Sequence, residues 1–334
     1  MAPPDTGSPR RETSVDTARK KPAAPHRPTG RLRLQIANQL RYRGFLLGAT
    51  LLPRLPLNVS YRLAVLAADL ARGLTPGRRV SVAENLRHVL GDAATPEHTA
   101  RLTREMYRNI ARYYVDFLRL PSVDVAELER RQLLDSGYHN LETALAEGRG
   151  VIVVTPHFGN PDTAIQAARA RGIEFFVLTE QIEPPELAEL YLRLRSSHGH
   201  RFMSVGLAAA KEAIRTLRRG GSVIIVADRD IQGTGVEATF FGRMTRMPTG
   251  AVDLARITGA PIIPAFSRRL PGNAVELLIE PRVELVRTAD RLADQRINVE
   301  RVVKRFEPHI RRDPGQWLVL EPIWPVGATA AQQP

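Results

Sequence analysis

The sequence predicts an α/β fold, a mixed and largely parallel β-sheet with helices on both faces, preceded by an N-terminal helical region. From residue 137 onward, short runs of branched aliphatic residues alternate with helical patterns, which is typical of a sheet covered by helices. The run 151–154, Val-Ile-Val-Val, is apolar at every position, as expected of a strand buried on both faces of a parallel sheet.

The two ends of the chain are expected to be disordered. Residues 1–29 are rich in Pro and Arg without apolar periodicity and predict a disordered basic tail, and 326–334 predict a second one. Between them we expect an N-terminal helical, membrane-associating region at 30–122 and an α/β catalytic domain at 123–325. Helices are expected at 97–118, 138–147, 161–172, 184–197, 207–219, 250–258 and 294–312. Strands are expected at 151–154, 174–178, 223–226, 261–264 and 275–279.

The run 45–52 is the longest apolar segment of the N-terminal region. It is far shorter than the roughly 20 residues that a membrane-spanning helix needs. Arg41 and Arg43 precede it and Arg54 follows, so it fits a helix lying in the membrane interface. An ordinary core helix is the second interpretation, and both stay open. We expect residues 1–75 to hold the protein to the cytoplasmic face of the inner membrane without spanning it.

The composition narrows the partners and the chemistry. The chain carries a formal charge of +13, and residues 1–45, with ten Lys/Arg against three Asp/Glu, hold +7 of it. A basic chain suits phospholipid headgroups or a phosphate-bearing donor. Nucleic acid is not an expected partner, because no nucleic-acid-binding signature occurs. The absence of cysteine excludes disulfides, cysteine metal sites and thiolate nucleophiles.

The stretch 157–162, His-Phe-Gly-Asn-Pro-Asp, is the main candidate for chemistry. Asn160 is a favourable helix N-cap and Pro161 a favourable first helical residue, so a helix is expected to begin at Pro161. His157 then lies on the turn at the carboxyl end of a strand, where open α/β sheets place their active sites. Asp162 falls in the first helical turn, within reach of His157. A base with an orienting carboxylate requires that arrangement.

Further polar residues follow other strands and helices. Asp228, Arg229 and Asp230 come directly after the strand at 223–226, at the same edge of the sheet as His157. They form either part of the site or a solvated salt-bridged turn. Arg195 closes a helix and is either a solvent-facing charge or a phosphate clamp. The segment from Phe240 to Arg243 is interpreted as a loop.

These motifs resemble the bacterial lipid A (lauroyl/myristoyl) acyltransferase superfamily. The His-x4-Asp stretch resembles the signature of that superfamily, and Asn85-Leu86 resembles its early Asn-Leu segment. The segments 107–121, 228–230, 235–237 and 240–242 are similar to its phosphatidylinositol mannoside acyltransferase branch, and Pro314-Gly315-Gln316-Trp317 resembles its closing segment. Two departures leave the acceptor open: Pro161 replaces a usual aromatic, and Asp228 stands where some members have Glu.

The resemblance implies a glycerolipid-acyltransferase-like fold and a membrane-associated O-acyltransferase. The donor would be acyl-CoA or acyl carrier protein, and the acceptor a glycolipid of the phosphatidylinositol mannoside or lipid A kind. His157 would be the base and Asp162 its partner, so Asp162→Asn is expected to keep the fold while lowering turnover. Glu180 and Asp228 would lie in the acceptor region, and Arg195 would contact a headgroup or the donor. Backbone N–H groups near 160–162 are expected to hold the oxyanion.

No cofactor is expected, and no metal ion is expected because no motif such as His-Glu-x-x-His occurs. No Gly-x-Ser-x-Gly elbow occurs either, so a covalent acyl-enzyme on serine is not expected. Two other functions stay open. One is a glycerophospholipid or lysophospholipid acyltransferase, although the phosphate loop typical of that class has no counterpart at 240–243. The other is a non-catalytic peripheral lipid-binding protein. The sequence does not indicate an oligomeric state.

Overall fold

A computed structural model describes residues 28–131 and 134–324 of the chain. Its main feature is a mixed sheet of strand order β1-β9-β8-β2-β5-β3-β4. The strands are β1 (Leu134–Ser136), β2 (Val151–Thr155), β3 (Phe175–Thr179), β4 (Arg201–Ser204), β5 (Ser222–Val226), β8 (Ile262–Arg269) and β9 (Val275–Ile279). All neighbouring pairs are parallel except β8 and β9, which form an antiparallel hairpin. The predicted mixed, largely parallel sheet is confirmed.

Helices cover both faces of this sheet, as predicted. One face packs against α6 (Tyr138–Ala146) and α7 (Pro161–Ala167), which bury Leu141 and Ile165 against β2 and β5. The other face packs against α9 (Leu207–Arg218), α10 (Gly250–Thr258) and α11 (Arg291–Arg312), which contribute most of the largest apolar cluster. Each helix buries the apolar stripe that its sequence periodicity predicts.

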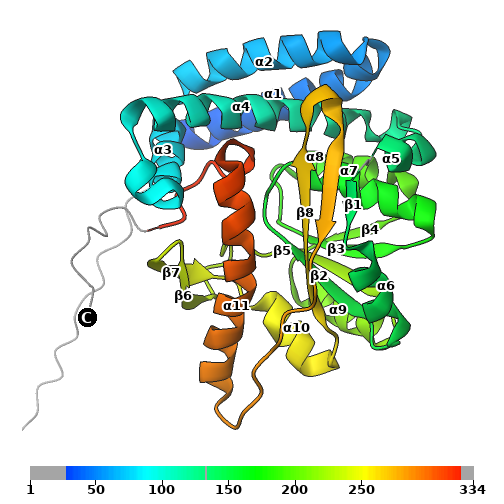
Figure 1. Cartoon of the computed structure of the whole chain (residues 1–334). Helices are drawn as coiled ribbons and strands as arrows, with labels where there is room; N and C mark the ends of the chain where they lie inside the picture. Colours follow the sequence, from blue (N-terminus) through cyan, green and yellow to red (C-terminus); the bar gives the residue numbers. More distant parts are fainter. Residues whose placement is uncertain (1–27, 132–133, 325–334) are drawn as a thin grey trace, which may run out of the picture.

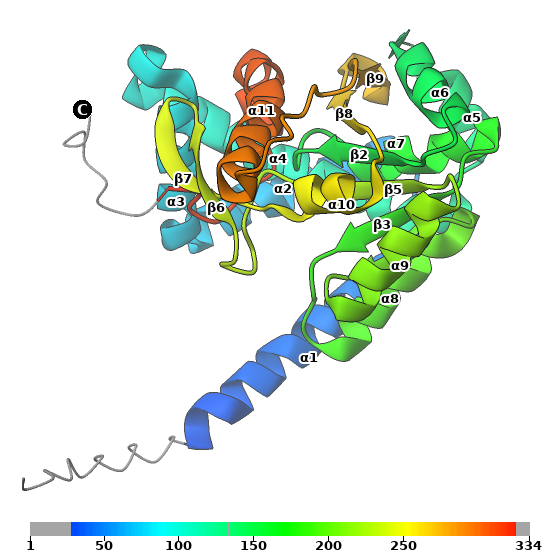
Figure 2. The same cartoon turned by 90° about the horizontal axis from the view of Figure 1, so that it is seen from below.

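The N-terminal helices form a layer across one edge of the sheet, as Figure 1 shows. They are α1 (Pro28–Leu51), α2 (Leu57–Leu74), α3 (Pro76–Leu90) and α4 (Pro96–Arg119), followed by the short α5 (Val125–Arg131). The β8–β9 hairpin reaches up to this layer. Phe45 of α1 packs against Tyr191 of α8 (Pro185–Arg195), with ring centroids 5.4 Å apart. Figure 2 shows the first turns of α1 projecting from the body of the molecule.

No helix of the described part of the chain is long and apolar enough to cross a bilayer. The predicted disordered tails, 1–29 and 326–334, lie outside the described residues apart from Pro28 and Thr29, with which α1 begins. The domain boundary expected at residue 122 stays a prediction.

The loop expected at 240–243 is confirmed for Phe241 and Gly242, which form the turn of a hairpin, whereas Phe240 and Arg243 belong to its two strands. Strands β6 (Val236–Phe240) and β7 (Arg243–Met247) pair antiparallel outside the main sheet. Phe241 and Gly242 both adopt positive φ, +51° and +75°, which is the conformation that a two-residue hairpin turn requires. The sequence of β7 has no clear strand pattern, because exposed and buried positions do not match polar and apolar residues. Arg243, Met244 and Arg246 are exposed, and Thr245 and Met247 are buried.

The register of β2 against β5 brings the motif and the acidic segment together. Thr155 lies opposite Val226, and Ala227 N–H donates to the Thr155 carbonyl at 3.0 Å. Because the two strands are parallel and end at the same level, the residues that follow them emerge side by side. His157 and Asp228 are therefore neighbours across the edge of the sheet.

Candidate active site

The turn between β2 and α7 is formed as the sequence predicts. Helix α7 begins at Pro161, and the Asn160 side chain accepts a hydrogen bond from Thr163 N–H at 3.3 Å. Gly159 has φ +66°, and a Cβ atom there would collide with the Ser267 carbonyl of β8, so only glycine fits. These constraints leave His157 on the turn with a side chain that is 30% exposed.

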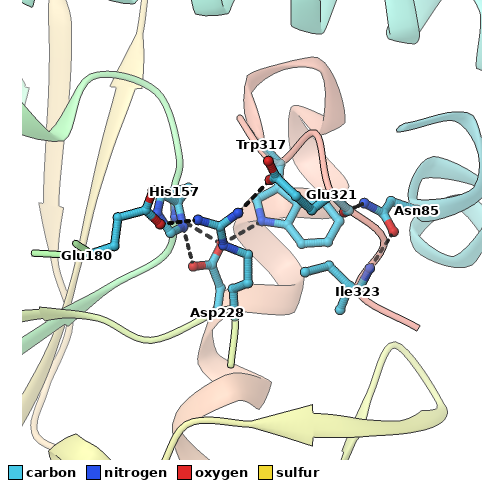
Figure 3. Close-up of polar contacts among 8 residues, drawn as sticks. Asn85, His157, Glu180, Asp228, Trp317, Glu321 and Ile323 are labelled. Carbon is cyan, nitrogen blue, oxygen red and sulfur yellow. Dashed lines mark hydrogen bonds and ion pairs between the residues drawn. The ribbon is translucent and has the colours of Figure 1, made fainter. Parts of the chain in front are cut away.

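His157 is paired with Asp228, as Figure 3 shows. Its Nδ1 lies 2.7 Å from Asp228 Oδ1, and its backbone N–H donates to Oδ2 at 3.0 Å. Trp317 Nε1 also donates to Oδ2, at 2.7 Å. Burial by itself would raise the pKa of the fully buried Asp228 carboxyl, but His157 and these donors lower it below its ordinary value.

The ionised carboxylate of Asp228 fixes the state of the imidazole. A carboxylate only accepts hydrogen bonds, so the proton of neutral His157 resides on Nδ1. Nε2 then carries the lone pair, on the side of the ring away from Asp228. A half-exposed histidine in this tautomer can take a proton from a substrate hydroxyl.

The predicted pairing of His157 with Asp162 is corrected by the structure. Asp162 lies on the face of α7 that packs against α4 and α8, whereas His157 turns toward β5. The Asp162 carboxylate accepts hydrogen bonds from Arg195 Nε at 3.0 Å, from Arg195 Nη2 at 3.2 Å and from the Tyr113 hydroxyl. A spacing of five residues placed both side chains near the turn, but only the tertiary structure decides the face of the helix.

Arg195 is correspondingly the buried counter-ion of Asp162, whereas we expected it to contact a headgroup or the donor, or to face solvent. Its side chain is 16% exposed and that of Asp162 is 6% exposed. Burial alone would lower the pKa of Arg195, but Asp162 and Tyr113 raise it, so the guanidinium stays charged. Burial and the charge of Asp162 also raise the pKa of Tyr113 well above its usual value, which keeps that hydroxyl a donor.

Arg229 joins two carboxylates at the open side of His157. Its guanidinium donates to Glu180, directly after β3, and to Glu321 near the end of the described chain, both at 2.5 Å. The two glutamates are 41% and 54% exposed, so they remain open to a ligand. Asp230 instead accepts Gly235 N–H at 2.8 Å and braces the loop before β6. The structure thus brings Glu180, Asp228 and Arg229 together near His157.

Sequence reasoning missed three residues of this arrangement: Tyr113, Trp317 and Glu321. Tyr113 lies on the apolar stripe of α4, so its hydroxyl gave no separate signal. Trp317 belongs to the closing segment noted in the family resemblance, which said nothing of the side chain's partner. Glu321 is separated from Arg229 by 92 residues, and only folding joins them.

Fewer backbone N–H groups than predicted are left to bind an oxyanion at 160–162. The N–H of Asn160 donates to the Ser267 carbonyl at 3.1 Å, and the N–H of Gly159 donates to the Gln316 carbonyl at 2.9 Å. Pro161 has no N–H. Within the span 160–162, this leaves the N–H of Asp162, in the first turn of α7, as the candidate donor to an oxyanion.

The buried ion pair predicts that Asp162→Asn destabilises the protein. Asparagine leaves the Arg195 guanidinium buried without a counter-charge, and breaking such a pair costs about 3–5 kcal/mol. We expect thermal unfolding of purified protein to show a melting temperature several degrees lower. The double variant Asp162→Asn/Arg195→Met, which removes both charges, should recover much of that loss. A single variant as stable as wild type would contradict the structural role of Asp162.

Comparison with known proteins identifies the family of this chain. Residues 35–325 match the family model of the bacterial lipid A biosynthesis acyltransferases. Among curated proteins, the chain is similar to the phosphatidylinositol mannoside acyltransferase of Mycobacterium tuberculosis, 31% identical over 72% of this chain and 75% of that one. It is also similar to the enzyme of the same name from Mycolicibacterium smegmatis, 27% identical over 87% of this chain and 94% of that one.

Proposed function

The chain belongs to the bacterial lipid A biosynthesis acyltransferase family and is an acyltransferase, and we propose that it esterifies a hydroxyl of a glycolipid with a fatty acyl group from a thioester. The acceptor is of the phosphatidylinositol mannoside class, as the names of the two relatives suggest. The donor is acyl-CoA or acyl carrier protein. The observation that carries the proposal is the His157–Asp228 pair, whose Nε2 has no hydrogen-bond partner among residues 28–131 and 134–324.

The reaction needs a base and then an acid at the same atom. His157 Nε2 takes the proton of the acceptor hydroxyl while that oxygen attacks the thioester carbonyl carbon. Asp228 stabilises the imidazolium that forms. The tetrahedral intermediate then breaks its carbon–sulfur bond, and the leaving thiolate takes the proton from Nε2. The products are the ester and the free thiol, and His157 returns to its neutral form.

The cluster of Glu180, Arg229 and Glu321 is suited to a polyhydroxylated headgroup. Carboxylates and a guanidinium together offer acceptors and donors to neighbouring sugar hydroxyls. Because both glutamates are half-exposed while Arg229 is only 18% exposed, a ligand would meet the carboxylates first. We assign the acceptor headgroup to this side of His157.

Replacing either member of the pair should abolish turnover. We expect His157→Ala to lower kcat by at least about three decades and Asp228→Asn by on the order of two to four, by analogy with triads. The double variant should be little worse than His157→Ala, because residues that act as one unit are not additive. Acyl transfer to purified acceptor, measured by mass spectrometry, checks this. His139→Ala, at an exposed histidine in the first turn of α6, is the control. Wild-type turnover in His157→Ala would exclude catalysis by this residue.

An apolar cavity behind the catalytic turn is a candidate site for the acyl chain. Its volume is about 60 Å³, and almost all of its wall is apolar. Thr155, Pro161 and Ser267 line the end next to the turn, and Leu141 and Ala164 line the side under the helices. This volume equals roughly two water molecules, so only a short part of a chain fits without movement of side chains. We propose that acyl methylene groups enter here.

Filling this cavity should shorten the preferred acyl chain. Ala164→Leu adds three carbon atoms at the wall, so we expect the ratio of kcat/KM values to move toward donors a few carbons shorter. Leu141→Ala removes three carbons and should move the ratio the opposite way, although a buried Leu→Ala change costs about 2–5 kcal/mol of stability. Competition among donors of different length measures both. An unchanged ratio in both variants would place the acyl chain elsewhere.

An exposed leucine stripe on α2 is a candidate membrane surface. Leu63, Leu66, Leu70 and Leu74 recur three and four residues apart and are between 52% and 72% exposed, on the side opposite the buried Tyr61 and Ala68. Soluble proteins rarely expose such a continuous apolar surface. In Figure 1, α2 is the outermost helix of the N-terminal layer. We propose that this stripe rests on a phospholipid bilayer.

Helix α1 carries a second exposed apolar stripe. Ile36, Leu40, Leu47 and Leu51 are 48% to 66% exposed, and Arg41 and Arg43 lie among them. Leucine with flanking arginine is the composition of a helix that lies in an anionic membrane interface. The same surface supports the proposed location at the cytoplasmic face of the inner membrane, held peripherally.

Acidic substitution of the α2 stripe should release the protein from vesicles. Each exposed leucine that enters a bilayer contributes up to about 1.5–3 kcal/mol, so Leu66→Asp/Leu70→Asp should lower vesicle partitioning at least roughly tenfold. Co-flotation with vesicles that contain anionic phospholipid measures it. Leu292→Asp is the control. Leu292 is 79% exposed and lies in the first turn of α11, at the end of this helix that is away from the N-terminal layer in Figure 1. Equal flotation of both variants would contradict this surface.

A further inference from the structure

We propose that Trp317 is a positioning residue for the reaction, holding Asp228 through its indole N–H so that this carboxylate faces His157. The inference rests on the proposed acyl transfer at His157. It gives the segment 314–317 a part in the chemistry of the His-x4-Asp motif, although Trp317 lies 160 residues after His157. Figure 3 shows the indole beside the carboxylate.

The two oxygens of Asp228 have different partners. Oδ1 faces His157 Nδ1 at 2.7 Å. Oδ2 accepts from His157 backbone N–H at 3.0 Å and from Trp317 Nε1 at 2.7 Å. With Oδ2 held by two donors, the carboxylate cannot rotate about its Cβ–Cγ bond without breaking one of them. Oδ1 is thereby kept in line with the imidazole.

The backbone around Trp317 is fixed to the catalytic turn as well. Leu318 N–H donates to the His157 carbonyl at 2.7 Å, and Gly159 N–H donates to the Gln316 carbonyl at 2.9 Å. Phe158 and Trp317 thus form an antiparallel bridge. The segment that orients Asp228 is therefore the same segment that holds the backbone of His157, and base and carboxylate are positioned by one element.

Burial makes this indole contact consequential. Trp317 and Asp228 are both fully buried, so no water replaces a lost donor without a cavity opening. The Trp317 N–H is among the groups that lower the pKa of Asp228 against the effect of burial. Loss of this N–H would raise the pKa of Asp228. A more basic carboxylate would also bind the Nδ1 proton of His157 more strongly.

Trp324 provides a matched control within the same aromatic cluster. It is 4% exposed and its ring centroid lies 6.3 Å from that of Trp317. Both indoles pack against Phe240. Yet Trp324 Nε1 has no hydrogen-bond partner among the described residues. Trp→Phe therefore removes similar packing at the two positions, but only at 317 does it remove a donor to Asp228.

The test compares Trp317→Phe with Trp324→Phe by thermal unfolding and steady-state kinetics. We expect both variants to lower the melting temperature, Trp317→Phe more strongly because the buried Asp228 carboxylate also loses a donor. Only Trp317→Phe should lower kcat, roughly ten- to a hundredfold, since a hydrogen bond to a charged group is of that size. KM should change little. Because loss of the indole donor raises the pKa of Asp228, the acidic limb of the pH–rate profile should move upward in Trp317→Phe only.

A second variant tests the same hydrogen bond if Trp317→Phe does not fold. Replacement of Trp317 by 3-benzothienylalanine keeps the ring shape and exchanges the N–H for sulfur, so it should reproduce the kinetic loss while it keeps the packing that Trp317→Phe removes. Equal kinetics in Trp317→Phe and Trp324→Phe, or wild-type kinetics in the sulfur analogue, would overturn the inference while leaving the proposed function intact. Wild-type turnover in His157→Ala would overturn the proposed function itself.

Discussion

The hydrogen-bonded pair of His157 and the buried Asp228, between the β2–α7 turn and the edge of the sheet, is the constraint on which the site depends. Asp228 is fully buried, and a buried carboxylate is stable only when its oxygens are satisfied. Its donors come from the β2–α7 turn and from the segment after α11, which are far apart in sequence. The geometry around His157 therefore exists only when the complete α/β sheet and its closing segment are in place.

Two further buried networks connect the N-terminal helices to this sheet. Tyr113 of α4 joins the Asp162–Arg195 pair between α7 and α8. Asp116, one turn further along α4, accepts from Asn160 at 2.7 Å and pairs with Arg269 at the end of β8. Both networks reach the first turn of α7, so the helical layer is bound to the same turn that carries His157. A shift of α4 would disturb that turn.

This attachment gives the proposed membrane contact a mechanistic meaning. The leucine stripe of α2 lies on the outer side of the layer, and α2 packs on α4. Asp69 of α2 holds Arg104 and Arg108 of α4 through paired hydrogen bonds, which keeps the stripe turned outward. A bilayer under this stripe would lie against the helices that cover the carboxyl edge of the sheet. An acyltransferase with lipid substrates needs its site near such a surface.

The local structure could be predicted from the sequence because strands, turns and helix starts depend mainly on neighbouring residues. The apolar run 151–154, the Asn160 cap and Pro161 specified a buried strand, a turn and a helix start, and the structure confirms all three. The alternation after residue 137 specified the α/β class. His157 at a strand's carboxyl end, with Asp228 at the same edge, followed from the parallel arrangement alone.

The partners of these residues were decided by the tertiary structure. Sequence spacing paired His157 with Asp162, but strand register set Asp228 beside it and helix packing gave Asp162 to Arg195. Register and helix rotation depend on the whole core, since a slip of one residue along β5 would turn its side chains to the opposite face. Contacts such as Trp317 to Asp228 close over 89 residues, and no local pattern encodes them. The sequence by itself placed His157 and Asp228 at one edge of the sheet, and folding decided which residues touch.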